Sequence, residues 1–378
     1  MKKIIIFGAG NMGKRAFIKY GIDNVLFFID NNEHIHGKKL NGLDIKAPSV
    51  LSEITTECKV IIASRHSESM AAQLEGMGIT DFEIYSENSY FDIPEVVFNP
   101  YSSQLDKNEV DQRDELKIKD INQKVTELTG SKIPLFNHIE IETVNRCNGV
   151  CGFCPVNKNA DTRPYKKMEE ELFYSIIHQL ENLNYRGKIA LFSNNEPFLD
   201  ERIIKFQKYM REHLPYARTH LCTNGTLLTI DKFLEIIPYL DELIIDNYND
   251  ELSLIAPCRK IAEYCEEHTE LKKKVTIVLR KINEVLTSRG GDSPNAEHCE
   301  KYPQASCLLP YKQMIVRPDG KVSLCCNDAL GKCTMGDLNK ESIEQVWFGR
   351  RFEKVRELLV NGRKEVERCQ YCDTLFIC

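Results

Sequence analysis

Three cysteines near the middle of the chain, Cys147, Cys151 and Cys154, restrict most strongly what this sequence can fold into. They follow an alternating run at 138–144 that predicts a β-strand, so the three thiols lie on one short loop. A structural zinc site takes four protein ligands, and this loop supplies three. A cubane iron–sulfur cluster can be held by three cysteines, which leaves one iron open for a small ligand. A zinc knuckle or redox thiols are the alternative interpretation.

The C-x3-C-x2-C spacing, with Phe153 directly before the third cysteine, resembles the signature of the radical S-adenosylmethionine superfamily. The resemblance implies a [4Fe–4S] cluster on the three cysteines, whose open iron binds S-adenosylmethionine. In this family, one electron from the cluster cleaves the sulfonium to methionine and a 5′-deoxyadenosyl radical, which abstracts a hydrogen atom from the substrate. The resemblance also implies an electron donor such as flavodoxin or ferredoxin.

Length, charge and cysteine content restrict the class of protein. The chain has 378 residues, enough for two or three domains, and a formal net charge of −6, which argues against a nucleic-acid partner. No segment reaches the ~18 apolar residues that span a bilayer, so we expect no membrane association. The 15 cysteines and the lack of a signal peptide predict a cytoplasmic protein whose reduced thiols bind metal. The sequence does not predict an oligomeric state.

The first 90 residues show a glycine-rich motif between a strand and a helix. Gly8, Gly10 and Gly13 follow the apolar run 4–7, and Asp30 ends the second apolar run, 25–29. In a doubly wound fold such glycines let the backbone approach a phosphate, and the acid accepts ribose hydroxyls. The alternative is that the glycines only permit tight packing of strand against helix. The pattern predicts a Rossmann-like domain over 1–90.

Within this domain, the stretches 28–32 and 36–42 resemble the N-terminal nucleotide-sugar-binding domain of bacterial sugar acyltransferases. The resemblance covers about residues 1–88 and implies a nucleotide-sugar ligand. From 91 to 135 the periodicity is weak, and two prolines and a charged run predict a linker, with a helix at 118–128.

After the cysteine loop, strand patterns alternate with helical patterns, which argues for parallel βα units. With the strand before Cys147 we count five strands, and we expect a sixth near 280–286; the others are predicted at 188–192, 219–222, 242–246 and 274–280. This agrees with the partial (β/α)6 barrel that the radical S-adenosylmethionine resemblance implies for residues 136–295. The predicted fold class is α/β, with the chemistry at the carboxyl ends of the barrel strands.

Several strand ends carry residues that the resemblance assigns to S-adenosylmethionine. Asn194, Asn195 and Glu196 precede a proline where the family usually has Gly-Gly-Glu-Pro, so two glycines are replaced here. Thr223 and Asn224 resemble the family's Thr-Asn-Gly turn. Phe153, the aromatic residue of the signature, belongs to the same set. Arg280 ends a strand and either faces a carboxylate of S-adenosylmethionine or is a surface arginine.

Two further features beside these strands are less specific. Cys222 directly precedes the Thr-Asn-Gly turn and is either a small buried residue or a hydrogen-atom donor to a substrate radical. The loop 287–294 carries paired glycines between an arginine and an aspartate, and it either closes over bound ligand or is a plain surface loop.

The last part of the chain, 296–378, is rich in cysteine. Residues 313–325 predict a hairpin around a Pro-Asp-Gly turn, with one cysteine before it and one at its end, and a distant C-x2-C pair follows a helix expected at 343–360. This arrangement resembles the SPASM/Twitch extension of radical enzymes in its single-cluster form. The resemblance assigns one auxiliary [4Fe–4S] cluster to Cys307, Cys325, Cys369 and Cys372.

The assignment leaves alternatives open. Cys326 competes with Cys325, because adjacent residues of a strand point to opposite faces. A second auxiliary cluster would draw on cysteines that the first leaves unused: Cys299, Cys326, Cys333 and Cys378.

These features lead to three functional hypotheses. The preferred one is a radical enzyme that abstracts hydrogen from a hydroxylated small molecule, a sugar, nucleotide sugar or aminocyclitol. It gives either a ketone, with the auxiliary cluster taking the second electron, or an epimer, with Cys222 returning a hydrogen atom. The second hypothesis is a peptide- or protein-modifying radical enzyme, and the third is a metal-stabilised binding protein. Substrate identity and the carbon attacked cannot be predicted.

Overall fold

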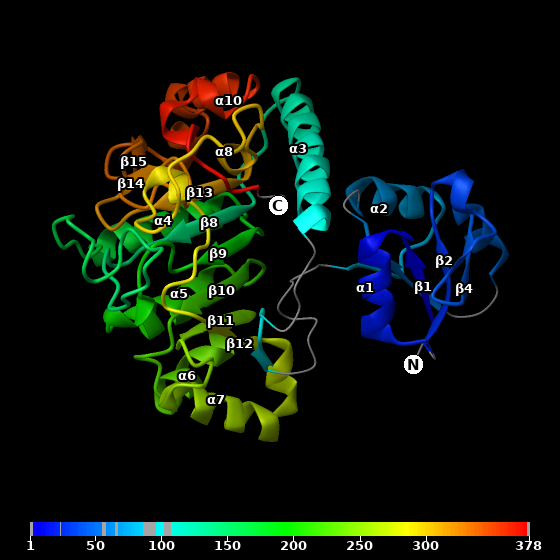
Figure 1. Cartoon of the computed structure of the whole chain (residues 1–378), viewed down its shortest axis with the longest axis horizontal. Helices are drawn as coiled ribbons and strands as arrows, with labels where there is room; N and C mark the ends of the chain where they lie inside the picture. The colour runs from blue at the N-terminus through cyan, green and yellow to red at the C-terminus, as the bar shows by residue number, and fades with distance from the viewer. Residues whose placement is uncertain are drawn as a thin grey trace. The chain divides into compact units, whose positions relative to one another are not determined.

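The computed structural model describes residues 3–22, 24–54, 58–64, 67–85, 96–101 and 107–375. The chain divides into two compact units, Met1–Ile93 and Pro94–Cys378, which we call unit 1 and unit 2 (Figure 1). The division lies three residues after the boundary expected at residue 90.

Unit 1 contains a six-stranded sheet in the order β3-β4-β2-β1-β5-β6. All neighbouring pairs are parallel except β3 with β4. The strands are β1 (Lys3–Phe7), β2 (Val25–Ile29), β3 (Lys39–Leu40), β4 (Leu43–Lys46), β5 (Cys58–Ile62) and β6 (Phe82–Ile84), and the helices are α1 (Asn11–Tyr20) and α2 (Ser67–Gly76). Apolar side chains on the two faces of the sheet form two separate small cores, as expected for a sheet covered on both sides.

The three glycines of the predicted motif have different surroundings. Gly8 has a φ of +116°, and a Cβ atom at Gly13 would lie 1.9 Å from the Gly8 carbonyl oxygen. A Cβ atom at Gly10 would have no atom within 4 Å. The Asp30 carboxylate accepts hydrogen bonds from the backbone N–H groups of Ala9 (2.7 Å) and Asn32 (2.9 Å). Tight packing therefore explains Gly8 and Gly13 but leaves Gly10 free to face a ligand.

These surroundings predict opposite results for two alanine substitutions. Gly13→Ala is expected to destabilise unit 1 by more than about 3 kcal/mol, because its methyl group would overlap the backbone of Gly8. Gly10→Ala is expected to change stability by less than about 0.5 kcal/mol, because the space around it is open. Hydrogen–deuterium exchange of β1 amides in the full-length protein measures both effects, and equal exchange in the two variants would contradict the prediction.

Unit 2 is built on a nine-stranded sheet in the order β15-β14-β13-β8-β9-β10-β11-β12-β7. Figure 1 shows the strands from β13 to β12 side by side, with helices on their outer side. Five parallel strands form the centre: β8 (His138–Ile141), β9 (Lys188–Ala190), β10 (Arg218–Thr223), β11 (Glu242–Tyr248) and β12 (Val275–Arg280). The helices that cross between them are α4 (Glu170–Asn182), α5 (Ile203–His213), α6 (Ile230–Ile236) and α7 (Ala256–Glu267).

The edge of this sheet differs from the prediction. Residues 281–286 form no strand, because their backbone bonds elsewhere: Ile282 donates to the Asp250 carboxylate and accepts from the N–H of Gly152. Instead β7 (Val97–Phe98), from the stretch expected to be a linker, pairs parallel with β12. The helix of that stretch, α3 (Lys107–Thr129), is longer than the 118–128 predicted.

The cysteine-rich end of the chain is joined to the barrel. β13 (Gln313–Val316) pairs parallel with β8 and antiparallel with β14 (Lys321–Ser323), so the predicted hairpin extends the barrel sheet. β15 (Thr334–Asp337) adds the last strand. One continuous apolar core includes Ile139 of β8 and Trp347 of the C-terminal part, so unit 2 folds as a single body.

The long helix predicted at 343–360 is two helices, α9 (Ile343–Trp347) and α10 (Arg350–Leu359). The chain turns at Gly349, whose backbone is extended and begins α10. A Cβ atom at Gly349 would lie 2.4 Å from the Gln345 carbonyl oxygen, so the turn requires glycine.

Candidate active site

The cysteine loop follows β8 at the carboxyl end of the barrel strands. The Cys147 sulfur accepts hydrogen bonds from the Gly149 backbone N–H (3.3 Å) and from the Asn224 side-chain amide (3.8 Å). Burial raises the pKa of the Cys147 thiol to about 11 and that of Cys151 to about 12. Without a cation beside them these thiols stay protonated; an iron–sulfur cluster would supply the positive charge that favours the thiolates.

The space beside these thiols fits a cluster. A Cβ atom at Gly149 would lie 3.3 Å from the Cys147 sulfur and 3.7 Å from the Cys151 sulfur. Any larger residue would therefore occupy volume beside the thiols. Cys154 also lies near both, since its charge acts on the pKa of each. The structure thus brings the three predicted ligands together around a cradle that glycine keeps open.

Residues that the sequence analysis did not identify fix the shape of this loop. The Asn157 side-chain amide donates to the carbonyl oxygens of Cys151 (3.1 Å) and Cys154 (2.8 Å). The Asn148 side chain donates to Thr226 (2.9 Å) and accepts from Asn224 (2.8 Å). Asparagines are common in loops, so the sequence carries no signal that distinguishes these two.

Glu196 connects two strand ends. One carboxylate oxygen accepts from the Thr223 hydroxyl (2.7 Å) and the Phe198 N–H (3.1 Å), and the other accepts from the Asn224 N–H (2.8 Å). The predicted Gly-Gly-Glu-Pro equivalent and the Thr-Asn-Gly turn therefore lie against each other. Glu196 is buried and fully engaged, so its role in this structure is to position Asn224 beside the cysteine loop.

The two asparagines before Glu196 differ in what they contact. The Asn194 side chain donates to the Cys326 carbonyl oxygen (3.0 Å) and accepts from Arg289 (3.2 Å). Asn194 therefore connects the barrel to the C-terminal part. The Asn195 side-chain nitrogen is buried and has no hydrogen-bond partner among the described residues. A buried donor without a partner is the stronger candidate for ligand contact.

Near the cysteine loop, Arg280 and Asp246 form an ion pair with 3.1 Å between Nε and Oδ1. The Cys222 sulfur lies 3.8 Å from the other Asp246 oxygen. Burial raises the pKa of Cys222, so this residue is present as a neutral thiol. Phe153 is buried, with its ring centroid 6.0 Å from that of Tyr248. These side chains place polar groups on the interior of the barrel beside the cysteine loop.

Two buried glutamates, Glu140 in β8 and Glu142 directly after it, add carboxyl groups to this interior. Burial raises the pKa of both Glu140 and Glu142 to about 7. Glu140 accepts a hydrogen bond from the Gln313 side chain (2.9 Å), and Glu142 accepts one from the Asn194 N–H (2.6 Å). The alternating pattern at 138–144 could have indicated these two glutamates, because the polar side of such a strand faces either solvent or a polar interior.

The four cysteines assigned to the auxiliary cluster line one enclosed cavity: Cys307, Cys325, Cys369 and Cys372. Arg363 and Arg368 also line it. Arg363 is buried and donates to the Cys372 carbonyl oxygen (2.7 Å), and its positive charge lowers the pKa of Cys307 against the effect of burial. Four converging thiols with cationic neighbours fit a closed iron–sulfur site.

Three other cysteines in the described C-terminal part do not line this cavity: Cys299, Cys326 and Cys333. Cys325 and Cys326 both follow β14 and lie outside the strand. Cys325 lines the cavity, whereas Cys326 lies near Glu140 and Arg289. Cys333 is partly exposed beside Asp328, and Cys299 is exposed. Cys378 lies outside the described residues. Among the described cysteines, these three are therefore not gathered into a second set of ligands.

The glycine-containing loop after the last barrel strand is anchored to the auxiliary site. The Ser288 hydroxyl donates to the Tyr371 carbonyl oxygen (2.6 Å), and Arg368 donates to the Gly290 carbonyl oxygen (3.1 Å). Arg289 adopts a φ of +50° and directs its side chain to Asn194. The loop thus carries a cationic side chain from the auxiliary site to the barrel interior.

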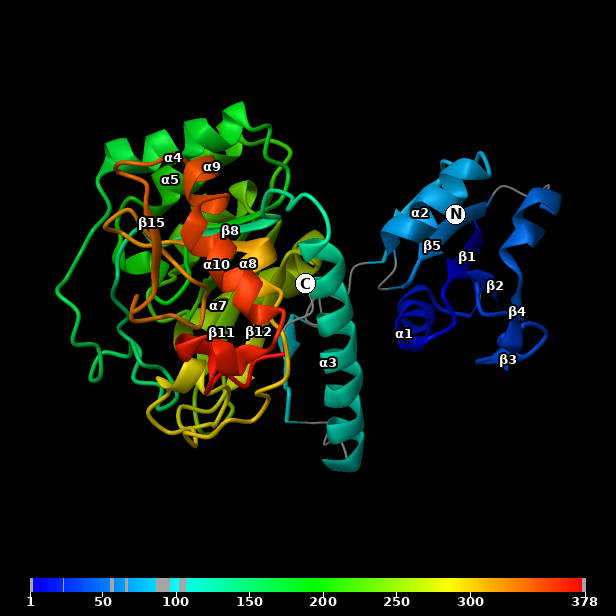
Figure 2. The same ribbon diagram turned by 90° about the horizontal axis from the view of Figure 1, so that it is seen from above.

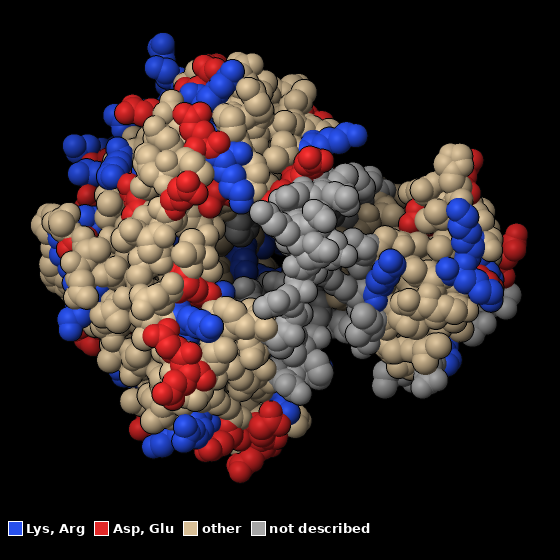
Figure 3. All heavy atoms as spheres, in the orientation of Figure 1, with Lys and Arg blue, Asp and Glu red and all other residues tan. Residues whose placement is uncertain are grey.

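The surface of the described residues carries charges of both signs. Figure 3 shows lysine and arginine interspersed with aspartate and glutamate on the face drawn. On this face the described residues form no extended basic patch, in agreement with the net charge of −6. Each helix within the described part of the chain is too short or too polar to cross a bilayer.

Comparison with known proteins identifies three regions. Residues 141–285 match the model of the radical SAM superfamily, and residues 307–373 match SPASM, an iron–sulfur cluster-binding domain. Residues 1–85 match the model described as C2185-like, N-terminal. The nucleotide-sugar ligand expected for this region stays a prediction.

One curated protein and one solved structure, each covered over nearly its whole length, are similar to this chain. The S-adenosyl-L-methionine-dependent 2-deoxy-scyllo-inosamine dehydrogenase of Niallia circulans is 29% identical over 246 residues, covering 64% of this chain and 95% of that protein. The crystal structure of BtrN in complex with AdoMet and 2-DOIA is 25% identical, with a TM-score of 0.55, covering 64% of this chain and 94% of that one.

The matched regions contain both cysteine sets, and the predicted α/β fold class is confirmed. The cofactors expected from the sequence, S-adenosylmethionine and [4Fe–4S] clusters, are those of the matched families. The chain therefore carries a radical SAM domain at 141–285 and a SPASM domain at 307–373, which make it an S-adenosylmethionine-dependent radical enzyme.

Proposed function

We propose that this protein is a radical S-adenosylmethionine dehydrogenase that oxidises one alcohol of an aminocyclitol, or of a closely related polyhydroxylated ring, to a ketone. The observation that carries the proposal is a group of polar side chains near both cysteine sets. Asp246 contacts Cys222 and lies near Cys151, and Glu140 and Arg289 lie near Cys326. The similarity to an aminocyclitol dehydrogenase, which covers 95% of that protein, supports the proposal. That similarity favours a small molecule over a peptide substrate.

The proposal assigns roles to the chain's own residues. Cys147, Cys151 and Cys154 hold the cluster that cleaves S-adenosylmethionine. The auxiliary set, Cys307 with Cys325, Cys369 and Cys372, holds the second one. When bound, these clusters supply the electron for the cleavage and accept the electron that the substrate radical gives up. The donor of the first electron is a protein such as flavodoxin or ferredoxin.

The carboxylates of the interior bind and deprotonate the substrate. Asp246 and Glu140 offer acceptors for the hydroxyl and ammonium groups of an aminocyclitol. With S-adenosylmethionine bound, a 5′-deoxyadenosyl radical would take the carbon-bound hydrogen atom, and ketone formation would then require loss of the hydroxyl proton and one electron. Glu140, whose burial raises its pKa to about 7, is the proposed acceptor of that proton. Asn195 and Asn224 are proposed to contact S-adenosylmethionine from the strand ends.

The test is anaerobic turnover of 2-deoxy-scyllo-inosamine with reductant and S-adenosylmethionine. We expect one 5′-deoxyadenosine and one ketone for each S-adenosylmethionine consumed. The rate of ketone formation should fall about tenfold for each pH unit below pH 7, because Glu140 must be deprotonated to take the proton. Glu140→Gln should lower ketone formation at least about 100-fold at pH 8.

A matched variant separates oxidation from epimerisation. Cys222→Ala should leave ketone formation within about threefold of the wild type, because oxidation requires no hydrogen-atom donor. Formation of an epimer that Cys222→Ala abolishes would contradict the dehydrogenase assignment. Failure to oxidise any member of a panel of aminocyclitols, inositols and nucleotide sugars, with 5′-deoxyadenosine still formed, would contradict the substrate class.

A further inference from the structure

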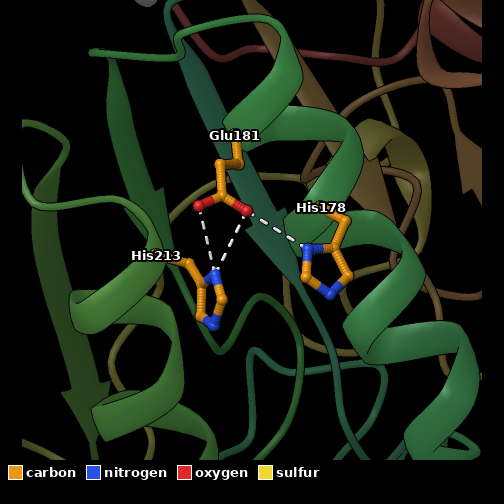
Figure 4. A group of neighbouring side chains, drawn as sticks. All are labelled: His178, Glu181 and His213. Atoms are coloured by element: carbon orange, nitrogen blue, oxygen red, sulfur yellow. Dashed lines mark hydrogen bonds and ion pairs between the residues drawn. The ribbon is translucent and has the colours of Figure 1, made fainter.

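Three potential metal ligands lie close together on the outside of the barrel. These residues have no role in the proposed reaction. Figure 4 shows His178 and Glu181 on α4 and His213 on α5, with the carboxylate between the two imidazoles. The Nδ1 atom of each histidine lies 3.1 Å from the same Glu181 oxygen, Oε2. The ligand atoms of the three residues all lie within 4.8 Å of one another.

These separations agree with the edges of a small metal polyhedron. A tetrahedral zinc ion with bonds of about 2.0–2.1 Å has ligand atoms about 3.3 Å apart. The separations of 3.1 Å between each Nδ1 and the carboxylate oxygen are close to this value. All three residues are at least partly exposed, so an ion has access from solvent and can keep water in the fourth position.

A second group of contacts orients the ligands. The Tyr209 hydroxyl lies 3.0 Å from the His178 Nε2 atom, on the far side of the ring from Glu181. The Tyr209 ring also packs on His213, with 4.2 Å between ring centroids. Metal-binding histidines are usually held in this way through their second nitrogen. A tyrosine hydroxyl suits this position, because it can accept a hydrogen bond from the imidazole once Nδ1 is bound to metal.

The place of the cluster in the barrel indicates its role. His178, Glu181 and His213 lie near the ends of α4 and α5, directly before β9 and β10 begin. They are therefore at the amino-terminal edge of the strands, whereas the cysteine loop follows the carboxyl end of β8. In barrels of this kind, that edge contributes stability rather than chemistry. The two helices lie side by side on the outside of the barrel in Figure 2.

We propose that His178, Glu181 and His213 bind one divalent transition-metal ion, with zinc as the fitting ion, and that this ion joins α4 to α5. Two imidazoles and one carboxylate favour zinc over magnesium or calcium, which prefer oxygen ligands. The site is separate from both cysteine sets.

The test uses the anaerobically prepared full-length protein with both iron–sulfur clusters in place, titrated with zinc chloride. Zinc K-edge absorption should show one zinc per chain with nitrogen and oxygen neighbours at about 2.0–2.1 Å, imidazole scattering, and no sulfur at about 2.3 Å. His213→Ala and Glu181→Gln should each weaken zinc binding at least about 100-fold in competition with a fluorescent chelator. The matched control His34→Ala, an exposed histidine of unit 1, should bind zinc as the wild type does.

Two further readouts distinguish this site from zinc bound by the cysteines. Zinc should raise the melting temperature of the wild type by several degrees and leave that of His213→Ala unchanged. The rate of 5′-deoxyadenosine formation should be the same in His213→Ala and the wild type. Equal zinc binding by the wild type and His213→Ala, or a zinc spectrum dominated by sulfur, would overturn the proposal.

Discussion

Replacing Cys151 by alanine is expected to abolish cleavage of S-adenosylmethionine, with 5′-deoxyadenosine formed at least about 1,000-fold more slowly than in the wild type. Cys151 is buried, and its thiol lies beside the space that Gly149 keeps open. With two ligands left, a cubane cannot be held by three of its irons. Iron content should fall from about eight to about four per chain, because the auxiliary set is unaffected.

The measurement is 5′-deoxyadenosine release under dithionite, together with iron analysis and the electron paramagnetic resonance of the reduced protein. Cys299→Ala is the matched control, because Cys299 is exposed and belongs to neither set of ligands. It should retain both clusters and full cleavage. Normal cleavage by Cys151→Ala would disprove the assignment of the loop, and so would zinc in place of iron at that loop in the wild type.

The second large effect is expected from Cys372→Ala. This variant should still cleave S-adenosylmethionine but form ketone at least about 100-fold more slowly, because the electron of the substrate radical has no acceptor. Its melting temperature should also fall by roughly 10 °C, because the cluster connects three separate segments of the C-terminal part. The ratio of 5′-deoxyadenosine to ketone should therefore rise well above one.

Cys326→Ala is the control for this variant. Cys326 faces Glu140 and Arg289 rather than the cavity, so its removal should leave the auxiliary iron content unchanged. Loss of auxiliary iron in Cys326→Ala, with iron retained in Cys372→Ala, would show that the ligands are assigned to the wrong cysteines. A ratio of 5′-deoxyadenosine to ketone near one in Cys372→Ala would remove the role of the auxiliary cluster as electron acceptor.

Some features of the site could be predicted from the sequence because they are local. The spacing of Cys147, Cys151 and Cys154 fixes three thiols on one loop, and strand periodicity places that loop at the end of a strand. The alternation of strands and helices restricts the core to a parallel sheet covered by helices. The hairpin at Gly320, which has a φ of +80°, is likewise a local property of its Pro-Asp-Gly turn.

Tertiary structure decided the features that depend on contacts between distant segments. The expected sixth strand at 280–286 is absent because the backbone of Ile282 bonds to Gly152 and Asp250. The short strand β7 forms only because β12 offers it a free edge.

The choice between Cys325 and Cys326 also depended on the fold, since both residues follow β14 outside the strand and only the packed C-terminal part shows which of them lines the cavity. The histidine–glutamate cluster of α4 and α5 arises in the same way, because His178 and His213 are far apart in sequence and meet only when the two helices pack. Local periodicity thus determined the elements and the cysteine loop, whereas packing between distant segments determined which side chains face each site.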